Sequence, residues 1–171
     1  MKLERYLDGR LYFYLMHLSY GTGREDDREE HWNYARENKL IGLDLPDDVP
    51  KNWNDMSDSE KQSLRRRRPM WYKQFELFCN EMKKDDLVVV VNGWDSLLGI
   101  GKVSQPKYNY CKILSETRTF FDHVRNIKWE MAQNYHKRIP LPVRLNGFNN
   151  TLLKVKVNTR FWMILSNIDL G

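Results

Sequence analysis

One segment near the middle of the chain constrains the fold more than any other. Residues 87–91 form an unbroken apolar and mostly β-branched run, which predicts a strand buried on both faces. Asn92 and Gly93 follow, and these residue types tolerate the positive φ angles of a tight turn. The returning strand carries Gly99 and Gly101 two residues apart, so both bare their backbone on one face. The segment therefore predicts a buried hairpin with a face that another group can approach closely.

Trp94 stands at the turn of this hairpin, beside the polar residues Asn92, Asp95 and Ser96. An aromatic ring on a rigid turn can stack on a flat ligand, and polar neighbours can hydrogen-bond to the edge of that ligand. Proteins that extrude a base from a duplex bind the base in this way. The alternative is that the ring folds back over the edge of the sheet and only packs there. We expect Trp94 to line a pocket.

Other aromatic and polar residues fall where they can contribute to the same pocket. Ser19 and Tyr20 leave the strand predicted at residues 11–18. Trp32 lies on the next predicted helix, and Tyr108 follows the second strand of the hairpin. We count all four as candidate pocket residues.

The remaining sequence predicts strands separated by helices. Apolar or alternating patterns indicate further strands at residues 11–18, 40–43, 109–114, 121–131 and 153–157. Helices are indicated at residues 28–38, from the capping-box pair Ser57 and Glu60 through Arg68, from Pro69 onward, and after Thr159. A strand count near six, with helices in the first half, predicts an α+β fold: a small twisted β-barrel with flanking helices. The length fits a single domain over residues 1–171.

Positive charge is concentrated in one short block. The formal net charge is +5, and the run Arg65, Arg66, Arg67 and Arg68 lies between Lys61 and Lys73. Nucleic acid is the leading partner for such a block, and an acidic protein surface is the second. Four consecutive arginines splay around a helix, so they cannot all reach one groove. A solvated helix end explains two of them, and a grip on a phosphate backbone is the other interpretation.

Catalytic signatures are absent, so we expect a non-catalytic chain without a cofactor or metal. The sequence has no phosphate-cradling Walker loop, no His-Glu-x-x-His motif and no paired Cys-x-x-Cys motif, and its four histidines lack metal-ligand spacing. The enzymatic alternative is a magnesium-dependent nuclease, which Asp47 and Glu81-x-Lys83 match superficially. That chemistry needs the Glu-x-Lys pair on a strand beside the metal, whereas here it ends an amphipathic helix.

The sequence also bears on the compartment. No apolar run approaches the roughly 20 residues that a membrane span requires, and the start MKLERYLDGR lacks the apolar core of a secretion signal. Two cysteines without a disulfide or metal spacing are typical of reduced thiols. We expect a cytoplasmic chain that does not contact a membrane.

Five segments follow one another along the chain before a tyrosine-bearing strand: LYFYLMHLS, HWNYARENK, LIGLD, FELFCNEMKKDD and LVVVVNGWDSLLGIGKV. Over roughly residues 11–131, this order resembles the EVE/YTH group of the PUA-like superfamily. In that group a Gly-Asp turn precedes a valine-rich strand, and here Asp85 takes the place of the glycine. Residues 99–103, GIGKV, match the next strand of the group closely. The arrangement is most similar to the N-terminal DNA-reading domain of archaeal McrB-type restriction proteins.

The resemblance implies a PUA-like fold that reads a methylated base within a cage of aromatic residues. In the restriction proteins such a domain works with a GTPase motor and a nuclease, which would lie outside this chain. YTH domains place a cage tryptophan in the short strand after the first helix, where this sequence has Leu43 and Asp44. Asp44 can accept a hydrogen bond from a base amino group, and the missing aromatic must then come from Trp32, Trp94 or Tyr108.

The leading hypothesis is a reader of double-stranded DNA that flips a methylated base into this pocket. N6-methyladenine is the first candidate for that base. The expected base-pocket residues are Ser19, Tyr20, Trp32, Asp44, Asn92, Trp94, Asp95 and Tyr108, and the expected backbone contacts are Arg65, Arg66, Arg67, Arg68, Lys107 and Lys112. The alternative is an RNA-binding module, because PUA-like folds commonly serve that role and RNA readers use single strands and the 2′-hydroxyl.

Overall fold

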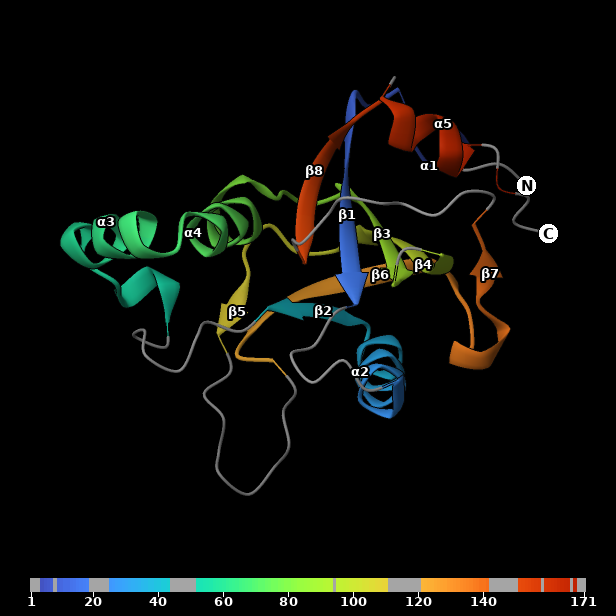
Figure 1. Cartoon of the computed structure of the whole chain (residues 1–171), viewed down its shortest axis with the longest axis horizontal. Coiled ribbons are helices and arrows are strands. Elements are labelled where there is room, and N and C mark those ends of the chain that lie inside the picture. Colours follow the sequence, from blue (N-terminus) through green and yellow to red (C-terminus); the bar gives the residue numbers. More distant parts are fainter. Residues whose placement is uncertain are drawn as a thin grey trace.

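The computed structural model describes residues 4–7, 9–18, 25–43, 52–93, 95–110, 121–141, 151–157, 159–166 and 168. One curled sheet forms its centre, in the order β2–β6–β4–β3–β1–β8, and the short strands β5 and β7 pair with β6 and β4 (Figure 1). The strands are β1 (Tyr12–Leu18), β2 (Leu40–Leu43), β3 (Leu87–Asn92), β4 (Ser96–Val103), β5 (Asn109–Tyr110), β6 (His123–Ala132), β7 (Ile139–Pro140) and β8 (Leu152–Lys156). The helices are α1 (Glu4–Leu7), α2 (Glu25–Glu37), η1 (Trp53–Asp55), α3 (Asp58–Arg67), α4 (Pro69–Phe75), η2 (Glu76–Glu81), η3 (Tyr135–Lys137) and α5 (Arg160–Ser166).

The structure confirms the coarser part of the predicted barrel, which is a mixed helix-and-strand fold with a twisted sheet. The six strands of the main path curl into a half-barrel whose two edges are β2 and β8. The strand predicted at 109–114 is described only as β5, and residues 111–114 lie outside the described part of the chain. No helix among the described residues is both long and apolar enough to cross a membrane.

The strand β3 separates two hydrophobic cores, as its uninterrupted apolar run predicts. Val88 and Val90 face the core that includes side chains of α2, α4 and η2. Leu87, Val89 and Val91 face the opposite core, which includes side chains of α1 and α5. All residues of β3 are buried. The strand pairs in parallel with β1, with Leu18 opposite Asn92, so the carboxyl end of β1 lies beside the β3–β4 turn.

The close approach predicted at Gly99 and Gly101 is confirmed, and the approaching groups are core side chains. A Cβ on Gly99 would lie 2.6 Å from Cη2 of Trp32. A Cβ on Gly101 would lie 2.4 Å from Cγ2 of Ile127 and 2.8 Å from Cε3 of Trp129. The glycines therefore serve internal packing here. The predicted turn is confirmed at Gly93, which has a φ of +56°, whereas Asn92 is the last residue of β3 and not among the residues with positive φ.

The predicted break between two helices is confirmed at Arg68 and Pro69. The Ser57 side chain accepts from the backbone N–H of Glu60, and the Glu60 carboxylate accepts from the backbone N–H of Ser57, so the capping box is present. Arg68 ends α3 outside the helical region, at φ −141° and ψ 66°, and Pro69 opens α4.

The sequence pattern does not predict that α4 widens into the π-helix η2. The marker of this change is the hydrogen bond from the backbone N–H of Met82 to the carbonyl of Leu77, five residues back, at 2.8 Å. In the sequence Trp71, Phe75, Phe78 and Met82 recur at i, i+4, i+7 and i+11, a helical spacing that predicts an apolar packing face against the sheet. In the structure Phe75, Phe78 and Met82 are buried, while Trp71 is half-buried. The packing face is therefore confirmed, although its regular helical spacing is not kept.

Candidate nucleic-acid interface

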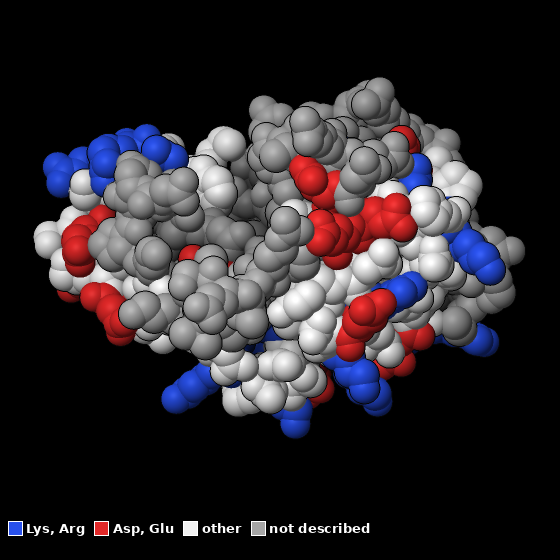
Figure 2. All heavy atoms as spheres, turned by 90° about the horizontal axis from the view of Figure 1, so that it is seen from below, with Lys and Arg blue, Asp and Glu red and all other residues white. Residues whose placement is uncertain are grey.

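A dense block of positive charge lies where α3 ends. Arg65, Arg66 and Arg67 occupy the last turn of α3, Arg68 is its C-cap, and all four side chains are exposed. Figure 2 shows Lys and Arg side chains projecting at the end of the molecule that α3 occupies in Figure 1. Within the described residues, no carboxylate lies at ion-pair distance from Arg65 or Arg66. Their guanidinium groups can therefore serve an anionic ligand.

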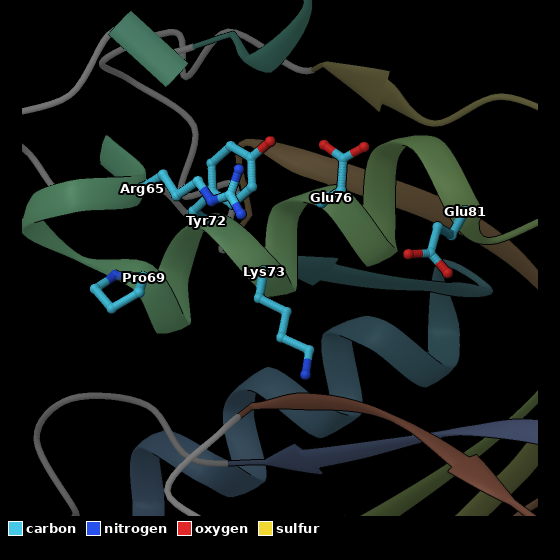
Figure 3. Close-up of a pocket in the computed structure, with 6 residues that line it drawn as sticks. All are labelled: Arg65, Pro69, Tyr72, Lys73, Glu76 and Glu81. Atoms are coloured by element: carbon cyan, nitrogen blue, oxygen red, sulfur yellow. The ribbon is translucent and has the colours of Figure 1, made fainter. Parts of the chain in front are cut away.

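A pocket of about 400 Å³ lies against α4 beside this block (Figure 3). The guanidinium carbon of Arg65 lies 5.8 Å from the centre of the Tyr72 ring, a cation–π contact at one end of the pocket. Lys73 and Glu76 project from the helix in different directions, so the cation and the carboxylate are presented on separate sides. The lining residues are Arg65, Pro69, Tyr72, Lys73, Glu76 and Glu81.

Two further hollows continue this pocket along the molecule. One of about 300 Å³ lies between α4, η2 and β8, and it shares Lys73 and Glu81 with the first. The next, of about 350 Å³, reaches β1 and shares Glu81 and Lys154 with the second. We call the three hollows together the basic groove. Its charged lining residues are Arg10, Arg65, Lys73, Lys83 and Lys154, against Glu76, Glu81 and Asp86.

Two of the three carboxylates in the basic groove are neutralised by ion pairs. Nζ of Lys154 lies 2.8 Å from Oε2 of Glu81, and a guanidinium nitrogen of Arg10 lies 3.0 Å from Oδ1 of Asp86. Such partly exposed pairs contribute little to stability. Their main effect is on the field of the groove, because Glu76 is then its one lining carboxylate outside an ion pair among the described residues. No carboxylate of the described residues lies at ion-pair distance from Arg65, Lys73 or Lys83.

A buried arginine holds the wall of the basic groove in place. Arg125 on β6 is only 1% exposed, and its guanidinium donates to the carbonyls of Phe78, Cys79 and Pro106 at 2.7 to 3.0 Å. Phe78 and Cys79 belong to η2, whose carbonyl end carries partial negative charge. Burial lowers the pKa of Arg125, the expected direction for a desolvated cation. Sequence reasoning misses this residue, and the one available signal is a cation at a core-facing position of β6.

His123 lies two positions before Arg125 on the same strand, and it anchors the segment that precedes α3. Its Nε2 accepts from the backbone N–H of Trp53 at 3.1 Å, and its ring packs edge-on against Phe75 at 4.9 Å between centroids. Burial lowers the pKa of His123 to about 4, so the ring is neutral at pH 7 and can accept this bond. Trp53 in turn stacks on Phe75, which connects η1 to α4.

Two residues predicted for the base pocket lie in the interior. Trp32 is 0% exposed, and its Nε1–H donates to the carbonyl of Gln133 at 2.8 Å. Its ring meets Trp129 edge-on at 5.3 Å between centroids. Asn92 is buried, and its amide donates to the hydroxyl of Tyr135 at 3.1 Å. The structure therefore uses Trp32 and Asn92 in core packing instead of on an open surface.

Tyr108 and Asp95, two more pocket candidates, also make internal hydrogen bonds. The buried Tyr108 hydroxyl donates to Oδ1 of Asn52 at 2.9 Å and accepts from the backbone N–H of Asn54 at 3.1 Å. Asp95 is exposed and accepts from the Ser96 hydroxyl at 2.9 Å. Of the predicted backbone contacts outside α3, Lys107 is exposed. The remaining candidates lie outside the described residues: Ser19, Tyr20, Asp44, Trp94 and Lys112.

Neither Glu81 nor Lys83, the described residues of the nuclease alternative, lies on a strand. Glu81 ends η2, where it pairs with Lys154, and Lys83 follows in a turn in which its backbone N–H donates to Asp86. Asp47 lies outside the described residues. The thiol of Cys79 is buried, and burial raises its pKa. Within the described part of the chain, no three His, Cys, Asp or Glu side chains are grouped as metal ligands.

A family model described as a domain of unknown function, DUF8426, matches residues 18–155. Comparison with curated proteins and with solved structures finds no match. The matched range runs from the last residue of β1 almost to the end of β8, and it includes α3, α4 and η2. The chain is therefore a member of the DUF8426 family.

Proposed function

We propose that this chain is a non-catalytic nucleic-acid-binding domain that holds the phosphate backbone with the end of α3 and the basic groove. The observation that carries the proposal is the exposed run of Arg65, Arg66, Arg67 and Arg68 at one end of that groove. Arginine clusters of this kind displace counterions from phosphates and hold the backbone of any sequence.

The shape of the basic groove favours a nucleic-acid strand over an acidic protein surface. Its cations are distributed along three neighbouring hollows that share lining residues, from Arg65 on α3 to Arg10 before β1. Tyr72 and Tyr12 line the two ends. Tyrosine rings beside spaced cations suit a polymer that alternates phosphates with flat bases. An acidic protein surface supplies charge without this alternation.

The finer proposal concerns a modified base. The domain would bind double-stranded DNA with a methylated base, N6-methyladenine first, flipped into a pocket that includes Trp94. It would act in the cytoplasm as the targeting domain of a modification-dependent restriction system, with the GTPase and the nuclease on other chains or domains. One support is the resemblance of residues 11–131 to EVE/YTH domains. The other is the pairing of Leu18 with Asn92, because the chain then leaves β1 and β3 at the same end of these two parallel strands.

A binding panel tests both levels of the proposal. Fluorescence anisotropy is measured on matched duplexes carrying N6-methyladenine, 5-methylcytosine or no modification, and on RNA duplexes and single strands of the same sequence. The N6-methyladenine duplex is expected to bind about fourfold more tightly than the unmodified one, because a buried methyl group contributes about 0.8 kcal/mol. Trp94→Ala should remove this preference and keep the backbone binding, whereas the exposed Met163→Ala should change neither.

The results of this panel test the backbone proposal and the modified-base proposal separately. Equal binding of all duplexes contradicts the modified-base reader and leaves the backbone proposal standing. Preferential binding of single-stranded RNA favours the RNA module. Absence of binding to every nucleic acid at low salt contradicts the proposed function as a whole.

A further inference from the structure

We infer that the pocket beside α4 takes one unpaired base with an exocyclic amino group, guanine above the others. This inference rests on the proposed function, because it requires a nucleic acid whose backbone is held by the arginine block. It adds a second point of recognition, about the base at the end of α3, that is separate from the β3–β4 turn.

The size and position of the pocket suit a single nucleotide. Its volume of about 400 Å³ falls near the lower end of the roughly 300–1,000 Å³ range of small-ligand sites. One end is formed by Arg65 over Tyr72, where a half-buried ring and a planar guanidinium offer stacking surfaces. A base that leaves the stack next to a phosphate held by Arg65 or Arg66 can therefore enter beside α4.

Glu76 gives the pocket its selectivity. An ionised carboxylate only accepts hydrogen bonds, and it repels phosphates. Glu81 is neutralised by Lys154, whereas Glu76 has no ion-pair partner among the described residues. An unpaired carboxylate in a phosphate-binding groove is useful when it accepts from base N–H groups. Guanine offers two adjacent donors, the ring N–H and the amino group, while thymine offers one N–H between two carbonyls.

The direction of the neighbouring side chains supports this division of roles. Lys73 and Glu76 point to different sides of the helix in Figure 3. Lys73 can therefore contact a phosphate without neutralising Glu76. The pocket thus separates a cationic side for the backbone from an accepting side for the edge of the base.

Short duplexes with one extrahelical nucleotide test the inference. The affinity of the whole chain is measured for a duplex with an extrahelical dG, the same duplex with an extrahelical dT, and the perfect duplex. The dG duplex is expected to bind about tenfold more tightly than the dT duplex, the scale of a good bidentate contact to a base. Glu76→Gln should reduce this ratio to below about twofold. Glu130→Gln, an equal charge change at an exposed position on β6, should keep it.

Three results would overturn the inference, and one of them would overturn the proposed function as well. Equal affinity for the dG and dT duplexes in the unmodified chain overturns the inference, and so does a preference that persists in both Glu76→Gln and Glu76→Ala. In either case, salt-sensitive binding of the perfect duplex leaves the proposed function intact. Failure to bind any of the three duplexes at low salt overturns the proposed function and the inference together.

Discussion

Arginine serves two opposite purposes in two regions of this molecule. Arg125 is buried on β6, where three backbone carbonyls accept its N–H groups and no carboxylate of the described residues lies at ion-pair distance. Arg65 and Arg66 are exposed at the end of α3 without a carboxylate among the described residues. The first region binds its cation with neutral carbonyls through four hydrogen bonds, and the second leaves its donors to an outside ligand.

We therefore expect the two regions to respond differently to mutation. A buried cation whose partners are carbonyls is part of the fold, because its removal leaves those carbonyls without donors. An exposed cation contributes little to the fold and much to the field around it. Stability should therefore depend on Arg125, and nucleic-acid binding on the end of α3.

The largest expected effect is on stability, from Arg125→Leu. This variant leaves the carbonyls of Phe78, Cys79 and Pro106 buried without their donor, so we expect the free energy of unfolding to fall by roughly 3–5 kcal/mol. Urea denaturation followed by circular dichroism measures this. Arg66→Leu is the matched control, with an expected change within about 0.5 kcal/mol. Equal losses in the two variants would remove the distinction between the regions.

The variant that tests the exposed region replaces Arg65, Arg66, Arg67 and Arg68 with Gln. We expect affinity for duplex DNA to fall by about ten- to hundredfold near physiological salt, with little change in unfolding free energy. The control makes the same charge change at four exposed lysines elsewhere on the surface: Lys39, Lys84, Lys128 and Lys137. A control that loses as much affinity as the arginine variant would show that net charge, and not the end of α3, determines binding.

Gly101→Ala tests how tightly the interior beside β6 is packed. Its Cβ would meet Ile127 at 2.4 Å and the carbonyl of Lys128 at 3.0 Å, so the strands must shift. Overpacking of this kind costs roughly 1–3 kcal/mol, which differential scanning calorimetry detects as a lower Tm. Ser104→Ala, at the exposed residue directly after the same strand, is the control. An unchanged Tm for Gly101→Ala would show that this region is looser than the structure implies.

Acid should destabilise the interior, because protonated His123 would be a second buried cation two positions from Arg125 on β6. The pKa of His123 falls from an ordinary value near 6.5 to about 4 in the fold, so the unfolded chain takes up its proton first as the pH is lowered. Stability from this residue is complete above about pH 6.5 and declines by roughly 1.4 kcal/mol per pH unit between 6.5 and 4.

His123→Phe should flatten this part of the stability curve, and unfolding by urea at several pH values measures it. His17, whose pKa is also lowered to about 4 by burial, keeps its own contribution in that variant. The exposed His136→Gln serves as the control for loss of a histidine elsewhere. An equal pH slope in His123→Phe and the unmodified chain would contradict the burial argument.

Local signals predict much of this fold, and the long-range contacts explain what they leave out. The run at 87–91, the capping box at Ser57 and the stop at Pro69 each depend on neighbours in sequence, and each is confirmed. The site is different. The bond from Arg125 to Phe78 joins residues 47 positions apart, and the widening of α4 into η2 accompanies it. Neither has a periodic signature.

The glycines of β4 also show that a local signal does not identify the residue on the other side of a long-range contact. Their spacing correctly predicts a close approach at Gly99 and Gly101, because the absence of a Cβ is a local property. Which group approaches depends on the register of β4 and β6 and on the position of α2. Those contacts bring Trp32 and Trp129 to this face, so the group that approaches the glycines belongs to the core.

If the end of α3 holds phosphates, the salt dependence of duplex binding reports how many of them it contacts. The logarithm of the binding constant is plotted against the logarithm of salt concentration for the unmodified chain and the four-arginine variant. Each phosphate contact contributes about 0.9 to the slope, so the variant should lose roughly 2–4 from its magnitude, while the four-lysine control keeps the original slope. Equal slopes for the unmodified chain and the four-arginine variant would contradict the account.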